Sequence, residues 1–171
     1  YKGKPVVMEG GALEINGRGT LITTEECLLH PTIQVRNPGF TKEDYLAVFK
    51  EYLGITNIIW LGNGVIGDDT HGHIDDLCRF VNENTVVTVI ETDKKSANYK
   101  PLQENLKILQ NASLENGEKL NIVTLPMPKD IVFEDLTLPA SYANFLILNN
   151  CVLMPTFNDV NDRVALNILA D

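Results

Sequence analysis

The sequence lacks features that would point to a membrane protein or a nucleic-acid-binding protein. No apolar run approaches the roughly 20 residues that a membrane-spanning helix needs. Lys and Arg together number only 14, against 23 Asp and Glu, and the net charge of −9 is the opposite of what a nucleic-acid-binding surface requires. The sequence therefore predicts no membrane partner and no nucleic-acid partner, and its acidity mildly favours a small cationic ligand.

Cysteine is also scarce. The chain has three cysteines in 171 residues, an odd number of scattered positions that does not suit a disulfide framework. No secretory signal is evident. We therefore expect reduced thiols in a cytoplasmic protein, with Cys27, Cys78 and Cys151 buried as small apolar side chains.

The hydrophobic pattern predicts one α/β domain, because the length and the 44% apolar content are sufficient for a packed core. A strand is expected at residues 5–8, and a hairpin at 12–15 and 20–23, with a loop over 25–38. A helix is predicted from Thr41 as N-cap to Gly54 as C-terminal stop, followed by a strand at 55–61.

The same order of elements then recurs. Strands are predicted at 73–81 and 85–90, a helix at 100–110 and a strand at 120–125. After a proline-containing connection, strands at 140–148 and 152–154 precede a helix at 161–170. The pattern therefore predicts repeated strand–strand–helix–strand units at residues 5–61, 73–125 and 140–171, about 65 residues apart. The last unit lacks its closing strand, so both ends of the chain are expected to be truncated.

The most unusual stretch is residues 68–80, where acids, two histidines and an arginine lie between hydrophobic runs. Alternation from His73 predicts a strand with His73, Asp75 and Arg79 on one face. A carboxylate beside an imidazole favours the cationic form, which suits a general acid, and the same pair could bind a cationic substrate. A surface ion pair without a catalytic role is the simpler alternative.

A metal site is a further alternative for this stretch. The spacing of His71 and His73 occurs among zinc ligands on strands. No third ligand is evident nearby, so a metal-dependent hydrolase ranks low and no metal is predicted.

Several strings together resemble the agmatine deiminase family of the peptidyl-arginine deiminase superfamily. They are residues 6–11 (VVMEGG), 19–29 (GTLITTEECLL), 36–38 (RNP), 69–75 (DTHGHID) and 140–145 (ASYANF). The resemblance implies the pentein fold, a propeller-like ring of five such units around a pseudo-fivefold axis with the active site in the central channel. It also implies a small cationic guanidino substrate, no cofactor, and assembly as a homo-oligomer.

The activity that this resemblance implies is hydrolysis of agmatine to N-carbamoylputrescine and ammonia, a step of putrescine and polyamine biosynthesis. In that family a cysteine thiolate attacks the guanidinium carbon and forms an amidino-enzyme, which water then releases. His73 corresponds to the general acid/base, whereas Glu9 and Asp75 correspond to the carboxylates that bind the guanidinium group. Asp69 is a candidate for the distal ammonium of the substrate, and Arg79 is expected to neutralise buried carboxylates.

The family's nucleophilic cysteine belongs to a motif that would follow Asp171, and a further aspartate motif would precede Tyr1. The chain alone is therefore expected to be inactive. Alternatives are an arginine or peptidyl-arginine deiminase, an amidinotransferase, and a non-catalytic pentein binding module. An enzyme for free arginine should place Lys or Arg against the α-carboxylate, which agmatine lacks.

Overall fold

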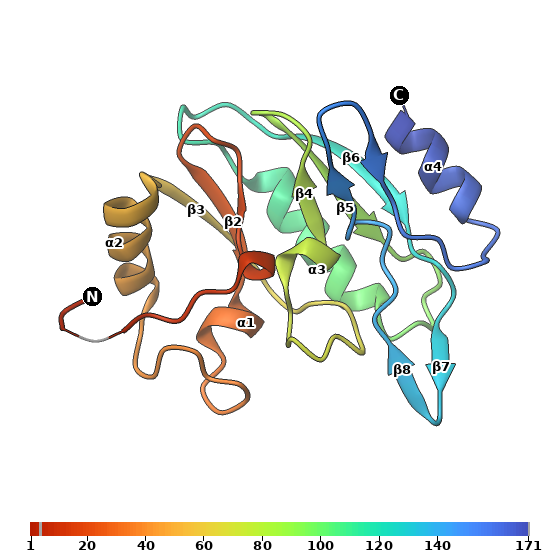
Figure 1. Cartoon of the computed structure of the whole chain (residues 1–171), viewed down its shortest axis with the longest axis horizontal. Coiled ribbons are helices and arrows are strands. Elements are labelled where there is room, and N and C mark those ends of the chain that lie inside the picture. The colour runs from red at the N-terminus through yellow and green to blue at the C-terminus, as the bar shows by residue number, and fades with distance from the viewer. Residues whose placement is uncertain (4, 171) are drawn as a thin grey trace.

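Two three-stranded sheets with the same topology form the body of the computed structural model, which describes residues 1–3 and 5–170 (Figure 1). The first unit comprises η1 (Gly10–Ala12), β1 (Glu14–Ile15), β2 (Thr20–Thr24), α1 (Glu25–Leu29), α2 (Lys42–Leu53) and β3 (Asn57–Leu61). Strand β2 pairs antiparallel with β1 and parallel with β3.

The second unit repeats this arrangement. It comprises η2 (Ile74–Asp76), β4 (Cys78–Phe80), β5 (Thr85–Ile90), α3 (Tyr99–Asn111) and β6 (Asn121–Pro126). Strand β5 pairs antiparallel with β4 and parallel with β6. The predicted order of strand, strand, helix and strand is thus confirmed in both units. Helix α3 packs against β3 as well as β5, so it joins the two sheets.

The remaining elements are short, mostly exposed strands and a last helix that contacts β6 and buries Ala165. They are β7 (Ile131–Phe133), β8 (Leu136–Leu138), β9 (Leu146–Ile147), β10 (Val152–Leu153) and α4 (Asp162–Ala170). The β7–β8 hairpin was not predicted, and the strand expected at 140–148 is only two residues long. Residues 140–143 instead form a buried turn, in which Ser141 Oγ donates to the Asp76 carbonyl oxygen at 2.6 Å.

Local capping chemistry explains which predicted elements were right in the first unit. Helix α2 begins with a capping box between Thr41 and Asp44 and ends at Gly54, whose φ of 71° requires the left-handed region. Residues 5–8 form no strand. The loop predicted at 25–38 begins with helix α1 instead, because the Thr24 hydroxyl accepts the Cys27 N–H at 3.1 Å and caps the helix.

The strand predicted at 73–81 is wrong in its first half. The chain enters residue 73 from a turn, because His71 and Gly72 have φ angles of 65° and 86°. Residues 74–76 then form a 3₁₀ helix and Leu77 has a helical backbone conformation, so residues 74–77 are not extended. Asp75 lies in the 3₁₀ helix η2, and the strand starts only at Cys78. The side chains of His73 and Asp75 therefore do not share a strand face, contrary to the prediction.

The fold is therefore a mixed α/β architecture with small sheets, and within residues 1–3 and 5–170 no sheet closes on itself. One apolar cluster lies under β3, β5, β6 and α3, and a second lies between α2, β2 and α1. None of the helices in the described part combines the length and hydropathy that crossing a lipid bilayer requires.

Candidate functional site

The two units meet through a glutamate and a histidine in corresponding places. Glu9 immediately precedes η1 and His73 immediately precedes η2, and these two 3₁₀ helices contact one another. His73 Nε2 lies 3.0 Å from Glu9 Oε2. The His73 side chain is 12% exposed and that of Glu9 37%, so the pair is half-shielded yet open on the glutamate side.

Gly11 lets the second unit approach the first. A Cβ at Gly11 would lie 2.5 Å from His73 Nδ1 and 2.6 Å from Asp75 Oδ2. Only a residue without a side chain leaves room there for both groups. The structure therefore brings the predicted residues Glu9, His73 and Asp75 together, although through two 3₁₀ turns and not along one strand.

Arg36 is the member of this centre that the sequence did not single out. Its Nε donates to Glu9 Oε2 at 2.9 Å, and its two terminal nitrogens donate to the carbonyl oxygens of Gln34 and Thr70. The side chain is only 6% exposed. The string RNP at 36–38 was the available signal, but nothing local indicated that this arginine reaches back to Glu9.

Asp68 fixes the loop that carries His73. Its Oδ2 accepts the backbone N–H groups of Gly72 and His73 at 2.8 and 2.9 Å, and its Oδ1 accepts the Thr70 N–H at 2.8 Å. Burial pushes the pKa of Asp68 upward, but the hydrogen bond that the Thr70 hydroxyl donates to Oδ1, together with these backbone hydrogen bonds, outweighs it, and the pKa falls below its ordinary value. Asp68 is thus an ionised cap that sets the position of the His73 backbone.

The pKa values of Glu9 and Asp75 are shifted in opposite directions. For Glu9, burial raises the pKa, but the hydrogen bonds and charges of His73 and Arg36 prevail and lower it. For Asp75, burial prevails over the charges of His73 and Arg79 and raises the pKa. Acidic groups with pKa values pushed apart are typical of sites that handle protons or bind cations.

Asp76 and Arg79 stabilise the surroundings. Burial raises the pKa of Asp76 to about 6, against the hydrogen bond that Asn144 Nδ2 donates to Asp76 Oδ1 at 3.1 Å. Arg79 Nε donates to Glu14 Oε2 at 2.7 Å, in a pair that is largely buried. Arg79 therefore neutralises a buried carboxylate, as expected, but its partner comes from the first unit.

Asp69 and His71 lie apart from the Glu9–His73 contact. Asp69 is exposed, and its carbonyl oxygen accepts the Gln34 side-chain N–H at 2.7 Å. His71 Nδ1 lies 3.4 Å from Glu26 Oε1, and its ring contacts that of His30 with 4.8 Å between centroids. The two histidines that suggested a metal site thus have separate surroundings.

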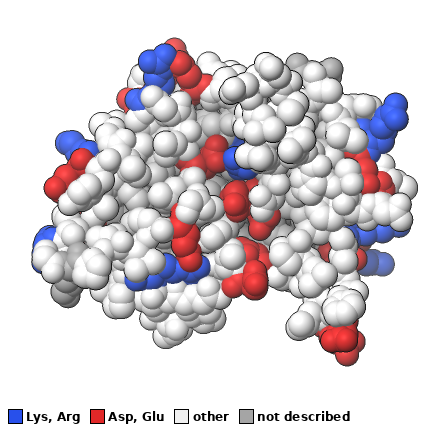
Figure 2. Space-filling model, viewed as in Figure 1, with Lys and Arg blue, Asp and Glu red and all other residues white. Residues whose placement is uncertain are grey.

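A cavity of about 420 Å³ opens beside this centre. Its lining contains no Lys or Arg among the described residues and consists of Asp68, Asp69, Thr70, His73, Asp75, Asp76, Pro139, Ser141, Asn144, Pro155 and Phe157. Figure 2 shows acidic side chains gathered along the middle of the molecule in this view, with basic side chains beside them, over the region between α1 and β4 in Figure 1. The arrangement suits a small cation.

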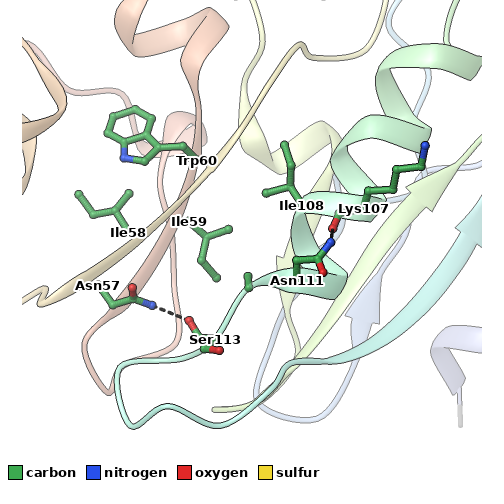
Figure 3. A pocket seen from close by; sticks show the side chains of 9 residues that line it. Asn57, Ile58, Ile59, Trp60, Lys107, Ile108, Asn111 and Ser113 are labelled. Atoms are coloured by element: carbon green, nitrogen blue, oxygen red, sulfur yellow. Dashed lines mark hydrogen bonds between the residues drawn. The ribbon is translucent and has the colours of Figure 1, made fainter.

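A larger cavity of about 510 Å³ lies elsewhere, between β3 and α3 (Figure 3). Ile58, Ile59 and Ile108 give it apolar walls, and Lys107 is the one titratable group in its described lining. It offers neither a carboxylate nor a histidine, so it is not the candidate site.

The cysteines do not supply an activated nucleophile in the described part of the chain. Burial raises the pKa of the Cys27 thiol to about 12, and full burial raises that of Cys78 further. Cys27 and Cys78 are buried as predicted, whereas Cys151 is exposed next to β10, contrary to the prediction. A high thiol pKa is the opposite of what a reactive cysteine needs.

Comparison with known proteins gives consistent results. The sequence model of the Porphyromonas-type peptidyl-arginine deiminase family matches residues 1–171. The agmatine deiminase of Stutzerimonas stutzeri (strain A1501) is 35% identical over 189 residues, an alignment that covers 100% of this chain and 50% of that protein.

Solved structures agree with this likeness. The structure of C. jejuni agmatine deiminase with substrate bound has a TM-score of 0.87 and 36% identity, and the match covers 98% of this chain and 48% of that one. The agmatine deiminase of Enterococcus faecalis has a TM-score of 0.86 and 33% identity, with 96% of this chain and 49% of that one covered. The chain spans about half the length of the relatives it matches.

Proposed function

The chain belongs to the Porphyromonas-type peptidyl-arginine deiminase family, and we propose that it supplies the acid–histidine half of an agmatine deiminase site. The reaction is hydrolysis of agmatine to N-carbamoylputrescine and ammonia. The observation that carries the proposal is the contact between Glu9 and His73, which joins a carboxylate and an imidazole from two equivalent units beside an acidic cavity.

Each residue has a role that its surroundings support. A planar guanidinium cation is bound best by carboxylates that accept paired hydrogen bonds, which suits Glu9 and Asp75. His73 is positioned to donate a proton to the departing ammonia and to activate water, since its ring faces the same carboxylates. Asp69, at the exposed edge of the cavity, is assigned to the distal ammonium of agmatine.

The nucleophile in this proposal is a cysteine outside the 171 residues. Cys27 and Cys78 are buried thiols with raised pKa values, so neither suits attack on a guanidinium carbon. We assign residues 5–61, 73–125 and 140–171 to three units of a pentein ring. The matching topology of the first two units supports that assignment.

Agmatine is favoured over arginine by the charges of the cavity. Free arginine brings an α-carboxylate that needs a cation, and the described lining offers none. The guanidinium groups of Arg36 and Arg79 are already engaged by Glu9 and Glu14. Placement in the cytoplasm is part of the same proposal, in keeping with three free thiols.

The test is turnover by the complete protein that contains this chain, with agmatine and arginine offered separately and both carbamoyl product and ammonia measured. We expect turnover of agmatine and at least about 100-fold lower kcat/KM for arginine, because an uncompensated buried carboxylate is costly. Glu9→Gln and Asp75→Asn should each raise KM for agmatine, whereas Glu118→Gln, a change at an exposed loop, should not. Equal turnover of both substrates would contradict the assignment to agmatine.

A further inference from the structure

The thiol of Cys27 lies beside the Glu9–His73 contact, and the proposed reaction makes no use of it. Cys27 Sγ is 3.9 Å from Glu9 Oε2, the same oxygen that is 3.0 Å from His73 Nε2. One ligand atom from each of these three residues lies within 4.8 Å of the other two. Sulfur, nitrogen and oxygen donors from three separate segments thus converge on one point.

This geometry is close to that of a zinc site with three protein ligands. Ordinary zinc bond lengths in a tetrahedron place sulfur about 3.6 Å from oxygen, and nitrogen about 3.4 Å from oxygen. The observed separations of 3.9 and 3.0 Å differ from those values by no more than about 0.4 Å. The sulfur–nitrogen separation lies within 4.8 Å, against about 3.6 Å in a tetrahedral site, so the Cys27 and His73 side chains rotate toward the ion on binding. The donor set of thiolate, imidazole and carboxylate is one that Zn²⁺ prefers.

We propose that Glu9, Cys27 and His73 form a zinc site through which Zn²⁺ reversibly inhibits the enzyme. The inference rests on the proposed function, because two of the three ligands are the residues assigned there to the substrate. On binding, the Cys27 S–H bond breaks, its proton leaves to solvent and a Zn–S bond forms. Glu9 and His73 each donate a lone pair, and the fourth position stays open to water.

The exposure of the three ligands indicates how the zinc ion enters, and their chemistry determines which metal ion they bind. The ion enters beside Glu9, the most exposed of the three ligands, and Cys27 lies behind it at 2% exposure. Mg²⁺ favours six oxygen ligands and is a poor match for a thiolate, so it should not occupy the site. The Arg36 guanidinium opposes a second cation at Glu9, whereas the nearby carboxylates of Asp68 and Asp75 favour it.

Zinc and agmatine exclude one another in this proposal. An ion bound by Glu9 and His73 removes one carboxylate from the guanidinium clamp and the imidazole from proton transfer. Inhibition should therefore be competitive with agmatine and reversible by a chelator.

The test uses the complete protein, stripped of metal and titrated with Co²⁺ as a spectroscopic substitute for zinc. Binding at Cys27 should produce a thiolate-to-cobalt absorption band in the near ultraviolet. Cys27→Ala should abolish that band and weaken zinc binding at least about tenfold, since loss of even an outer-shell partner of a metal ligand costs about 10–100-fold in affinity. Cys151→Ser, which alters an exposed thiol, should change neither, and Mg²⁺ should not displace cobalt.

Each result bears on a separate claim. A missing band in the unaltered protein, or equal zinc affinity and equal inhibition in the Cys27→Ala variant, would overturn the zinc site. Cys27→Ser, which keeps the side-chain size, separates loss of the ligand from a packing defect in the alanine variant. A band that disappears in both variants, in a protein that does not turn over agmatine, would support the zinc site and refute the proposed function.

Discussion

The first and second units have the same backbone plan but carry different chemistry. In both, a 3₁₀ turn leads into an antiparallel hairpin, and the threonines at 23 and 88 donate to carbonyl oxygens 11 residues earlier, at Ala12 and Leu77. The residues before the 3₁₀ turns differ, since one is Glu9 and the other His73. The repeated plan thus brings unlike groups to like places, and the site forms between them.

The units also differ in the connection between the hairpin and the helix. After β2 the chain forms α1 and a loop that brings Cys27 and Arg36 to Glu9. After β5 the connection bonds mostly within itself, as where Glu91 Oε1 accepts the N–H groups of Thr92 and Asp93. Only the first connection reaches the centre, which suggests that the repeat positions the site and the loops determine what it binds.

The largest effect should come from the histidine of the second unit. In the complete protein that contains this chain, His73→Asn should reduce kcat for agmatine about 10³-fold, because it removes the group proposed to carry the proton. His71→Asn is the matched control, since asparagine tolerates the positive φ at residue 71 and the side chain lies outside the centre. Steady-state kinetics on both variants, with circular dichroism to verify folding, decide this. Equal losses would remove His73 from its assigned role.

The approach of the two units can be tested at adjacent glycines. Gly11→Ala should lower kcat/KM about 100-fold, because its Cβ would displace His73 and Asp75 and small misplacements of catalytic groups cost that much. Gly10→Ala should have little effect, since its Cβ would meet no atom within 4 Å. If kinetics show the two variants to be equally active, the centre does not depend on the close contact at Gly11.

How much the sequence could predict depends on how local the cause is. Helix α2 was predicted because Thr41 and Gly54 cap it through their own neighbourhood. The 3₁₀ turn at η2 was missed, because alternation alone resembles a strand and the side chain of Asp68 fixes the preceding loop. Cys27 and Arg36 were missed as neighbours of Glu9, because the contacts span 18 and 27 residues and leave no periodic trace.

A smaller effect should follow from removing the guanidinium group of Arg36, which lies in the loop after α1. Arg36→Met should raise KM for agmatine about tenfold, because a hydrogen bond to a charged group contributes about 1.5–3 kcal/mol and here it orients Glu9. Arg36 also lowers the pKa of Glu9, so its loss should raise that pKa. The acid limb of the kcat/KM profile should then move to higher pH, as Glu9 takes up its proton sooner. An unchanged profile would show that Arg36 does not act through Glu9.

The smallest effect concerns stability, and it compares how much the corresponding threonine hydrogen bond contributes to the free energy of unfolding in each unit. Thr23→Val and Thr88→Val keep the side-chain shape and remove the hydroxyl that reaches Ala12 or Leu77. A buried carbonyl left without its donor costs about 1–3 kcal/mol.

The Leu77 oxygen also accepts the Val89 N–H at 3.0 Å, so it keeps a partner after the change. Thr23→Val should therefore reduce the free energy of unfolding by about 2 kcal/mol and Thr88→Val by about 1 kcal/mol or less. Urea denaturation measures both, with Thr23→Ser as the control that retains the hydroxyl. Equal losses of unfolding free energy would mean that the Val89 N–H does not compensate the Leu77 oxygen for the lost hydroxyl. The threonine hydrogen bond would then contribute equally to the stability of both units.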